Sequence, residues 1–221
     1  MGLFSAQFEK EGAGRPLPTG GGARYFALLI SQFWKLLGAN LLFVLFSLPV
    51  FTVPAALCAL NRVCLSVYRR GSAYVWQNFF EEFRSSLLRH IPVALMYTLL
   101  LFAAYYLMSL GLSNGAVPVW SVAFWTLGIL AAAAALGWSS CYFVLAALLE
   151  QKNSVLMKNS VLLCLAAPLP TAGRCALIVA FAAAVAALFP VSLFLMLLFL
   201  PGILQYTLCF LVYEQAQEYM D

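Results

Sequence analysis

Long apolar stretches alternate with short polar stretches along the chain, and this pattern predicts a bundle of membrane-spanning α-helices. A helix needs about 20 apolar residues to cross the hydrocarbon of a bilayer. Six stretches approach or exceed that length: residues 24–50, 54–70, 92–111, 119–149, 174–189 and 192–213. The fourth is longer than a bilayer requires, so we expect it to tilt or to project into the cytoplasm. The sixth contains Pro201-Gly202, where we expect a kink or a break.

The first apolar stretch has two alternative starting points. A span that began near Lys35 would be rather short when the chain reaches Pro49. We therefore expect Tyr25–Trp34 to lie at the cytoplasmic interface, with the Lys35 ammonium group reaching the lipid headgroups. Pro49 and Pro54 then bracket a tight turn on the outer side.

Two short amphipathic segments separate the spans on the predicted cytoplasmic side. In the first, apolar residues recur at every fourth position, which is typical of one helix face: Val75, Phe79, Phe83 and Leu87. Polar residues occupy its other face: Gln77, Asn78, Glu81, Glu82 and Ser85. The second segment is 155–165, which ends before Pro168 and Pro170. We expect both to form elbow helices that lie in the membrane plane or under the bundle.

The positions of the basic residues predict the orientation. Lys and Arg near span ends are retained in the cytoplasm. They occur in the N-terminal tail, in 69–89 and in 150–174, whereas the three turns on the opposite side carry none. Six spans with both termini in the cytoplasm satisfy this rule, and five would leave a basic loop outside. The predicted organisation is a tail at 1–24, a single transmembrane domain at 25–213 and an acidic tail at 214–221.

Composition supports a lipid environment. Hydrophobic residues make up 64% of the chain and charged residues 9%, whereas a soluble domain is nearer to half apolar and a quarter charged. The bilayer is therefore the predicted outer solvent. The net charge of +4 is small, and no basic run interleaved with aromatic residues indicates nucleic-acid binding. The N-terminal stretch has no apolar core of the kind that a signal peptide needs.

Motifs for chemistry are weak, and we expect a non-enzymatic protein without a cofactor or metal ion. Gly111–Gly115 matches the G-x-S-x-G pattern of serine hydrolases, but His90 is about 30 Å away along the same helix. No Walker A or H-E-x-x-H motif is present. The six cysteines all lie in or beside apolar stretches without a C-x-x-C pair, so we interpret them as small apolar filler, with a disulfide or metal role as the alternative.

The predicted spans contain no Asp or Glu. Transport coupled to protons or sodium usually places a carboxylate in the membrane, so this absence argues against a stand-alone ion-coupled transporter. It leaves a channel or facilitator open.

A few polar residues do fall inside the spans, and they form a candidate intramembrane polar cluster: Lys35, Asn40, Asn61 and Arg62. A charge near the middle of the bilayer is costly without a partner. Arg62 could serve as a site for an anionic group or for a partner's carboxylate. The favoured alternative is structural, with Arg62 bonded to Asn40, to Asn61 or to free carbonyls near Pro49 and Pro54.

The polar face of the first elbow is the candidate surface for a partner protein. Its residues are Asn78, Glu81, Glu82 and Arg84, which point away from the apolar stripe. The outer turns are too short and too uncharged to offer a specific surface. We therefore expect a partner to bind from the cytoplasmic side.

Several motifs of the chain resemble the YesL-like family of small bacterial membrane proteins, whose molecular activity is unknown. The matching stretches are Phe33-Trp34-Lys35-Leu36, Asn40-Leu41-Leu42, Phe46-Ser47-Leu48-Pro49-Val50-Phe51-Thr52, Pro54-Ala55-Ala56, Tyr68-Arg69-Arg70-Gly71 and Trp76-Gln77-Asn78-Phe79-Phe80-Glu81-Glu82-Phe83-Arg84. Members often carry Gly where this chain has Val53. The resemblance supplies no catalytic residues.

The resemblance implies a role beside carbohydrate ABC transporters and their sensor kinases, because such genes are commonly neighbours of this family. The leading hypothesis is a non-enzymatic accessory subunit or regulator of a carbohydrate uptake system in the bacterial cell membrane. The alternative is a small channel or facilitator, acting alone or as a homo-oligomer. A polar path through one protomer would favour the channel, and a dry core would favour the accessory role.

Overall fold

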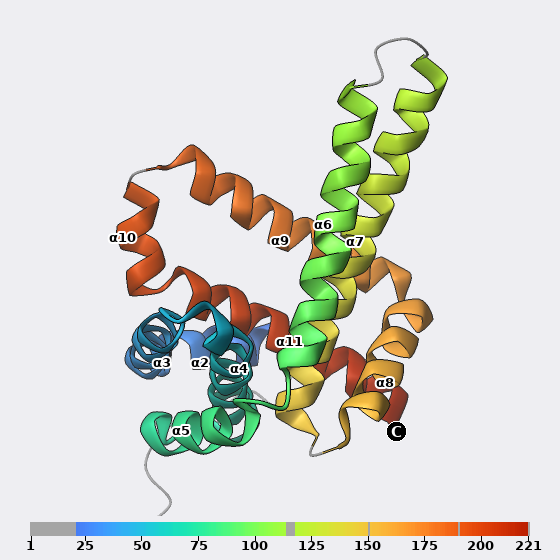
Figure 1. Cartoon of the computed structure of the whole chain (residues 1–221). Helices are drawn as coiled ribbons and strands as arrows, with labels where there is room; N and C mark the ends of the chain where they lie inside the picture. The colour runs from blue at the N-terminus through green and yellow to red at the C-terminus, as the bar shows by residue number, and fades with distance from the viewer. Residues whose placement is uncertain (1–20, 114–117, 150, 190, 221) are drawn as a thin grey trace, which may run out of the picture.

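The structure is a computed structural model that describes residues 21–113, 118–149, 151–189 and 191–220. Within these residues the regular elements are helices, which confirms the predicted all-α class (Figure 1). They are α2 (Gly21–Ser31), α3 (Phe33–Phe46), the 3-10 turn η1 (Val50–Thr52), α4 (Val53–Arg70), α5 (Val75–Ser86), α6 (Ile91–Ser113), α7 (Pro118–Leu148), α8 (Asn153–Ala166), α9 (Pro168–Ala187), α10 (Val191–Leu198) and α11 (Leu200–Met220).

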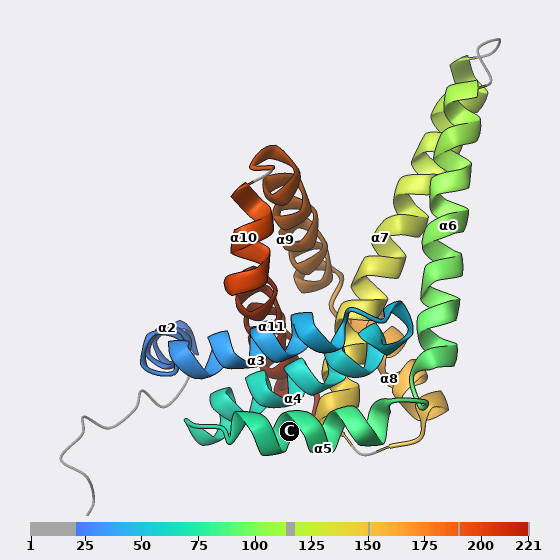
Figure 2. The ribbon, with the colours of Figure 1, turned by 60° about the vertical axis from the view of Figure 1, so that its left-hand side comes forward.

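Helix α4 forms the centre of the molecule. Two thirds of its apolar length is buried, and it packs against α3, α5, α7 and α11. Figure 2 shows α3, α4 and α5 running side by side across the base of the hairpin that α6 and α7 form. The α9 and α10 helices rise on the same side of this base as the α6–α7 hairpin (Figures 1 and 2).

The α6–α7 hairpin is held by close backbone contact. A Cβ atom added to Gly128 of α7 would lie 2.6 Å from Met108 Cγ and 3.0 Å from the Ala104 carbonyl oxygen of α6. Glycine at this position therefore permits an approach that any side chain would prevent. Most of the outward side chains of both helices are exposed and apolar, as expected of surfaces that lie in lipid.

Among the described residues, four helices are long and apolar enough to cross a membrane, and a fifth candidate is the pair α2 and α3, which bends by 74°. The number of six spans therefore stays a prediction. The predicted sixth span is divided at Phe199 into α10 and α11. This break is the one expected at Pro201-Gly202: proline lacks an N–H and its ring disfavours a continuous helix through this point.

Helix boundaries also differ at both ends of the chain. The first described helix begins at Gly21, within the stretch expected to be a tail, and α11 continues to Met220, through the stretch expected to be an acidic tail. The sharp bend between α2 and α3 lies at Gln32, inside the Tyr25–Trp34 segment that was expected at the interface.

The two elbows have different characters. The first is α5, whose Phe79 is fully buried and contacts Phe46 and Phe83, so its apolar stripe is confirmed. The second, α8, is helical as predicted but is not amphipathic: Leu162 and Leu165 are exposed on the same helix as Lys158. Its buried side is narrow, so most of its apolar residues face outward.

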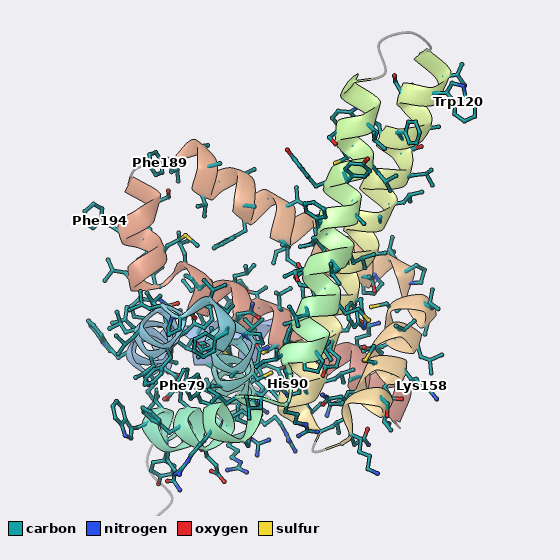
Figure 3. All side chains as sticks on the ribbon, in the orientation of Figure 1. Phe79, His90, Trp120, Lys158, Phe189 and Phe194 are labelled. Carbon is teal, nitrogen blue, oxygen red and sulfur yellow. The ribbon has the colours of Figure 1, made fainter. Side chains whose placement is uncertain are left out.

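The predicted sidedness is supported for two of the three outer turns and not for the first. Figure 3 shows Phe79, His90 and Lys158 near the base, with Trp120, beside the second predicted outer turn, and Phe189, beside the third, at the far ends of the hairpins. The turn between α3 and α4, predicted on the outer side, lies at the base next to the first elbow, because Phe46 at the end of α3 contacts Phe79, Phe80 and Phe83 of α5 (Figure 2). Which end faces the cytoplasm remains a prediction.

Candidate functional site

A polar cleft of about 440 Å³ lies at the base, between α4, α5 and the end of α7. Its lining residues are Arg62, Leu65, Ser66, Arg69, Arg70, Tyr74, Gln77, Asn78, Glu81, Ala147 and Leu148. A neighbouring cleft of about 270 Å³ shares Arg62, Asn78 and Glu81 with it and adds Glu82, Ser85, Arg89 and Ala146. We call the two together the base groove.

The sequence places the base groove beside the C-terminal end of α4. Gly71 ends that helix in the left-handed conformation, at φ 75°, and its N–H bonds the Val67 carbonyl. Arg24 of α2 donates to the carbonyl oxygens of Tyr68, at 2.9 Å, and Arg69, at 3.0 Å. These contacts satisfy carbonyls that a helix end leaves free and set a positive charge against the negative end of the helix dipole.

The base groove carries charges of both signs. Arg62, Arg69 and Arg70 face it from α4, and Glu81 faces it from α5. The Arg69 guanidinium also lies over the Tyr213 ring, 5.9 Å from its centroid. The basic side chains outnumber the acidic ones, so we expect the groove to attract anionic groups of a ligand or partner.

Helix α5 is joined to α4 by a side-chain hydrogen bond, in which the Asn78 amide donates to Ser66 Oγ at 3.1 Å. Within α5 the Ser86 hydroxyl donates to Glu82 Oε1 at 2.7 Å. Glu82 is half-buried, whereas Glu81 and Arg84 are exposed. Of the predicted partner face, Asn78, Glu81 and Glu82 line the base groove; Arg84 is not among its lining residues.

The structure separates the residues of the predicted polar cluster. Arg62 Nη1 donates to the Ala147 carbonyl of α7 at 2.9 Å, a backbone acceptor of the predicted kind but not one near Pro49 or Pro54. Asn61, its neighbour in sequence, is fully buried and accepts a hydrogen bond from Cys209 of α11 at 3.4 Å. Adjacent residues of α4 thus face different helices.

Asn40 has a structural position of its own. Its Oδ1 accepts from the Gly202 N–H at 2.9 Å, and its Nδ2 donates to the Met196 carbonyl at 3.3 Å. It thereby joins α3 to both sides of the break between α10 and α11, where backbone groups lack intrahelical partners. Lys35 lies half-buried in the first turn of α3, a different helix from the one that carries Arg62.

Sequence reasoning missed two residues of the interior. The sequence predicts Arg174 at the start of the fifth span, whereas the structure buries it fully, with its guanidinium bonded to Gln215 Oε1. Gln215 falls within the predicted acidic tail, yet its amide also donates to the Leu163 carbonyl at 3.0 Å. The only sequence signal for this buried pair is that an arginine adjoins one predicted span and a glutamine adjoins the end of another.

His90 is fully buried at the corner between α5 and α6, where the sequence suggested a headgroup position. Its Nδ1 lies 2.8 Å from Tyr142 Oη. Burial lowers the pKa of His90 to about 4, and the neighbouring Arg89 adds to the effect. The G-x-S-x-G match at Gly111–Gly115 lies partly outside the described residues, and its Gly111 lies near the opposite end of α6 from His90.

Arg89 joins the two elbows. Its Nε donates to Asn153 Oδ1 at 3.1 Å, and the Asn153 amide donates back to the Arg89 carbonyl at 2.5 Å. A further bond runs from the Arg89 guanidinium to the Gln151 carbonyl. The corner before α6 and the start of α8 therefore form one continuous layer at the base.

Comparison with known proteins gives one match. A family model described as a protein of unknown function, DUF624, matches residues 36–107, about a third of the chain. No curated protein matches the chain, and no solved structure matches it. The matched segment runs from α3 through α4 and α5 into α6, and so includes two of the three walls of the base groove. Over these residues the chain is similar to a family of unknown function, and its apolar helices are those of a membrane protein.

Proposed function

We propose that the chain is a non-enzymatic accessory subunit or regulator of a bacterial carbohydrate uptake system, and that its partner binds at the base groove. The observation that carries the proposal is the meeting of Arg62 with Asn78 and Glu81 in one polar groove. Arg62 comes from the polar cluster predicted inside a span, and Asn78 and Glu81 come from the partner face predicted on the first elbow. The structure brings both into the lining of one groove. The YesL-like motifs in α3, α4 and α5 supply the link to sugar uptake.

The packing of α4 favours an accessory role over conduction. The side chains that fill the centre of the molecule from this helix are small or aliphatic: Ala55, Ala56, Ala59, Leu60, Val63 and Val67 are all fully buried. These six side chains offer no polar surface to water or ions, and the polar side chains Arg62 and Ser66 of the same helix line the base groove. The polar groups of the base groove gather instead at one end, where a peripheral partner can reach them.

We propose the cell membrane as the location, with both termini and the base groove in the cytoplasm. The candidate partners are the components of a carbohydrate ABC transporter or its sensor kinase. Homo-oligomer formation through the exposed apolar helices is compatible with this arrangement. The basic residues near the base support the orientation.

Affinity purification of the tagged chain in a mild detergent, from the bacterium that encodes it, tests the proposal. We expect transporter or kinase components to co-purify, and Arg70→Glu to weaken their recovery and to change its salt dependence, because charges at an interface rim act by screened attraction. Arg84→Glu is the matched control: it makes the same charge reversal at an exposed arginine that does not line the groove. Equal effects of the two variants, or recovery without any uptake component, would contradict the proposal.

A further inference from the structure

Two cysteine thiols from neighbouring helices lie in contact inside the molecule. Cys164 Sγ of α8 is 3.3 Å from Cys141 Sγ of α7 and also 3.3 Å from the Gly137 carbonyl oxygen. Cys141 is fully buried and Cys164 is half-buried. A disulfide bond would bring the two sulfur atoms from this contact distance to about 2 Å.

A buried cation accompanies the pair. Arg174 is fully buried, and its Nη2 lies 3.1 Å from Cys141 Sγ and 2.8 Å from Thr171 Oγ1. Its guanidinium also bonds Gln215, so the contacts that hold it are to neutral groups. Its Nε has no hydrogen-bond partner among the described residues. A buried charge in such surroundings favours an anion beside it, and a thiolate is the anion that Cys141 or Cys164 can supply.

The same geometry argues for thiol reactivity and against metal binding. A guanidinium in contact with Cys141 Sγ repels a metal cation but stabilises a thiolate. The contact with the Cys141 thiol lowers the pKa of Cys164, and the Arg174 charge acts in the same direction. Cys164 is therefore the nucleophilic member of the pair.

The thiols adjoin an apolar cleft of about 940 Å³ between α6, α7, α8 and α9. Cys164, Gly137 and Thr171 contribute to its wall. Leu130 and Leu165 line its outer part and are 66% and 72% exposed, so the cleft opens on the apolar outer surface of the helices, where we expect lipid. Its volume lies in the range of sites for small organic molecules. A polar oxidant would have to leave water to reach it, whereas a lipid-soluble molecule would not.

We propose that Cys141 and Cys164 form a reversible dithiol–disulfide couple that passes two electrons to a quinone-class acceptor in this cleft. In the reaction an S–S bond forms and both S–H bonds break. The two electrons and two protons reduce the acceptor's carbonyl oxygens to the hydroxyl groups of a quinol. The Arg174 guanidinium acts as a positioning group that stabilises the thiolate of Cys164. The site shares no lining residue with the base groove, so it stands or falls independently of the proposed function.

The test uses the full chain in lipid nanodiscs, reduced, freed of reductant and treated without oxygen with decylubiquinone, a short-chain quinone. Unreacted thiols are then alkylated under denaturing conditions, and peptides are mapped by mass spectrometry. We expect a Cys141–Cys164 disulfide and one quinol formed per chain. Cys141→Ser and Cys164→Ser should each abolish both products. Cys175→Ser is the matched control, because Cys175 lines the same cleft but its thiol bonds the Ala133 carbonyl instead of a second thiol.

The thiol oxidant diamide separates the two parts of the inference. A disulfide with diamide but no quinol with the quinone would overturn the acceptor. No Cys141–Cys164 disulfide with either reagent, or a disulfide between other cysteines, would overturn the couple itself. Arg174→Gln should shift the alkylation of Cys164 to higher pH, and an unchanged profile would refute the role of Arg174. If that variant does not fold, the pH dependence of Cys164 alkylation is measured in the parent chain instead. Alkylation of Cys164 only at the pH at which an ordinary thiol reacts would also refute the role of Arg174.

Discussion

The buried imidazole of His90 makes the fold sensitive to mild acid. In the folded chain its Nδ1 contacts Tyr142 Oη and its Nε2 is buried, so the charged form has lost its water. Burial lowers its pKa to about 4, whereas the unfolded chain has a value of about 6.5. Because the unfolded state binds the proton more readily, stability is full above about pH 6.5 and falls as the pH drops toward 4.

The size of the effect follows from these two pKa values. Between about pH 7.5 and about pH 5.5 the linkage relation gives a loss of roughly 1.3 kcal/mol in the free energy of unfolding. That is a substantial part of the stability of a small domain. Carboxylates outside the membrane also titrate as the pH falls, so the parent chain alone cannot isolate His90. His90→Gln keeps a group that can bond Tyr142 Oη but does not titrate, and it carries the same carboxylates.

The assay is equilibrium unfolding by sodium dodecyl sulfate in mixed micelles, followed by tryptophan fluorescence at the two pH values. We expect the parent to lose roughly 1 kcal/mol more than His90→Gln over this interval. Tyr142→Phe, which removes the partner but leaves His90, should retain the pH dependence of the parent. Equal pH dependence in the parent and in His90→Gln would refute the reasoning, and so would greater stability of the parent at the lower pH.

Three further results are expected. Arg62→Leu should insert normally but lose about 1 kcal/mol of stability with the bond to the Ala147 carbonyl; Arg84→Leu is the exposed control, and equal loss in both would contradict this role. Asn40→Ala should cost about 1–3 kcal/mol in the same unfolding assay, because the Gly202 N–H loses its acceptor; an unchanged midpoint would show that water or a lipid replaces Asn40. A cysteine introduced at Ser72 should react with a membrane-impermeant maleimide only in inverted vesicles, and one at Asn114 only in intact cells; the opposite pattern would reverse the orientation.

Features that depend on neighbouring residues of a single helix could be predicted from the sequence. The stripe of Phe79 and Phe83 appears as a four-residue repeat, and the structure buries it against Phe46. Pro201 predicts an interruption of the helix, and the structure interrupts it at Phe199, between α10 and α11. In both cases neighbouring positions on one segment carry the information, because helical periodicity and the proline ring act over a few residues.

The interior sites could not be predicted, because their members come from different helices. Cys141 and Cys164 have no characteristic spacing and meet only when α8 folds back on α7. Arg174 resembles an interfacial cation in the sequence, and the structure buries it where it bonds Gln215 of α11. His90 likewise looked like a headgroup residue, and the corner before α6 is covered by Tyr142 of α7. Each depends on a tertiary contact that no local pattern specifies.

The polar residues of the central helix show how this fold selects its packing. Apolar side chains gain little by exchanging lipid for protein, so burial alone does not decide which helices associate in a membrane. Asn61 of α4 contacts α11, and Arg62 of the same helix bonds α7. Asn40 of α3 bonds both sides of the α10–α11 break. Each contact satisfies a group that would be costly to leave unpaired in lipid, and each joins a different pair of elements. The polar residues therefore tie α4 to α7 and α11, and α3 to α10 and α11. Arg62, which bonds α7, also lines the base groove at the end of α4.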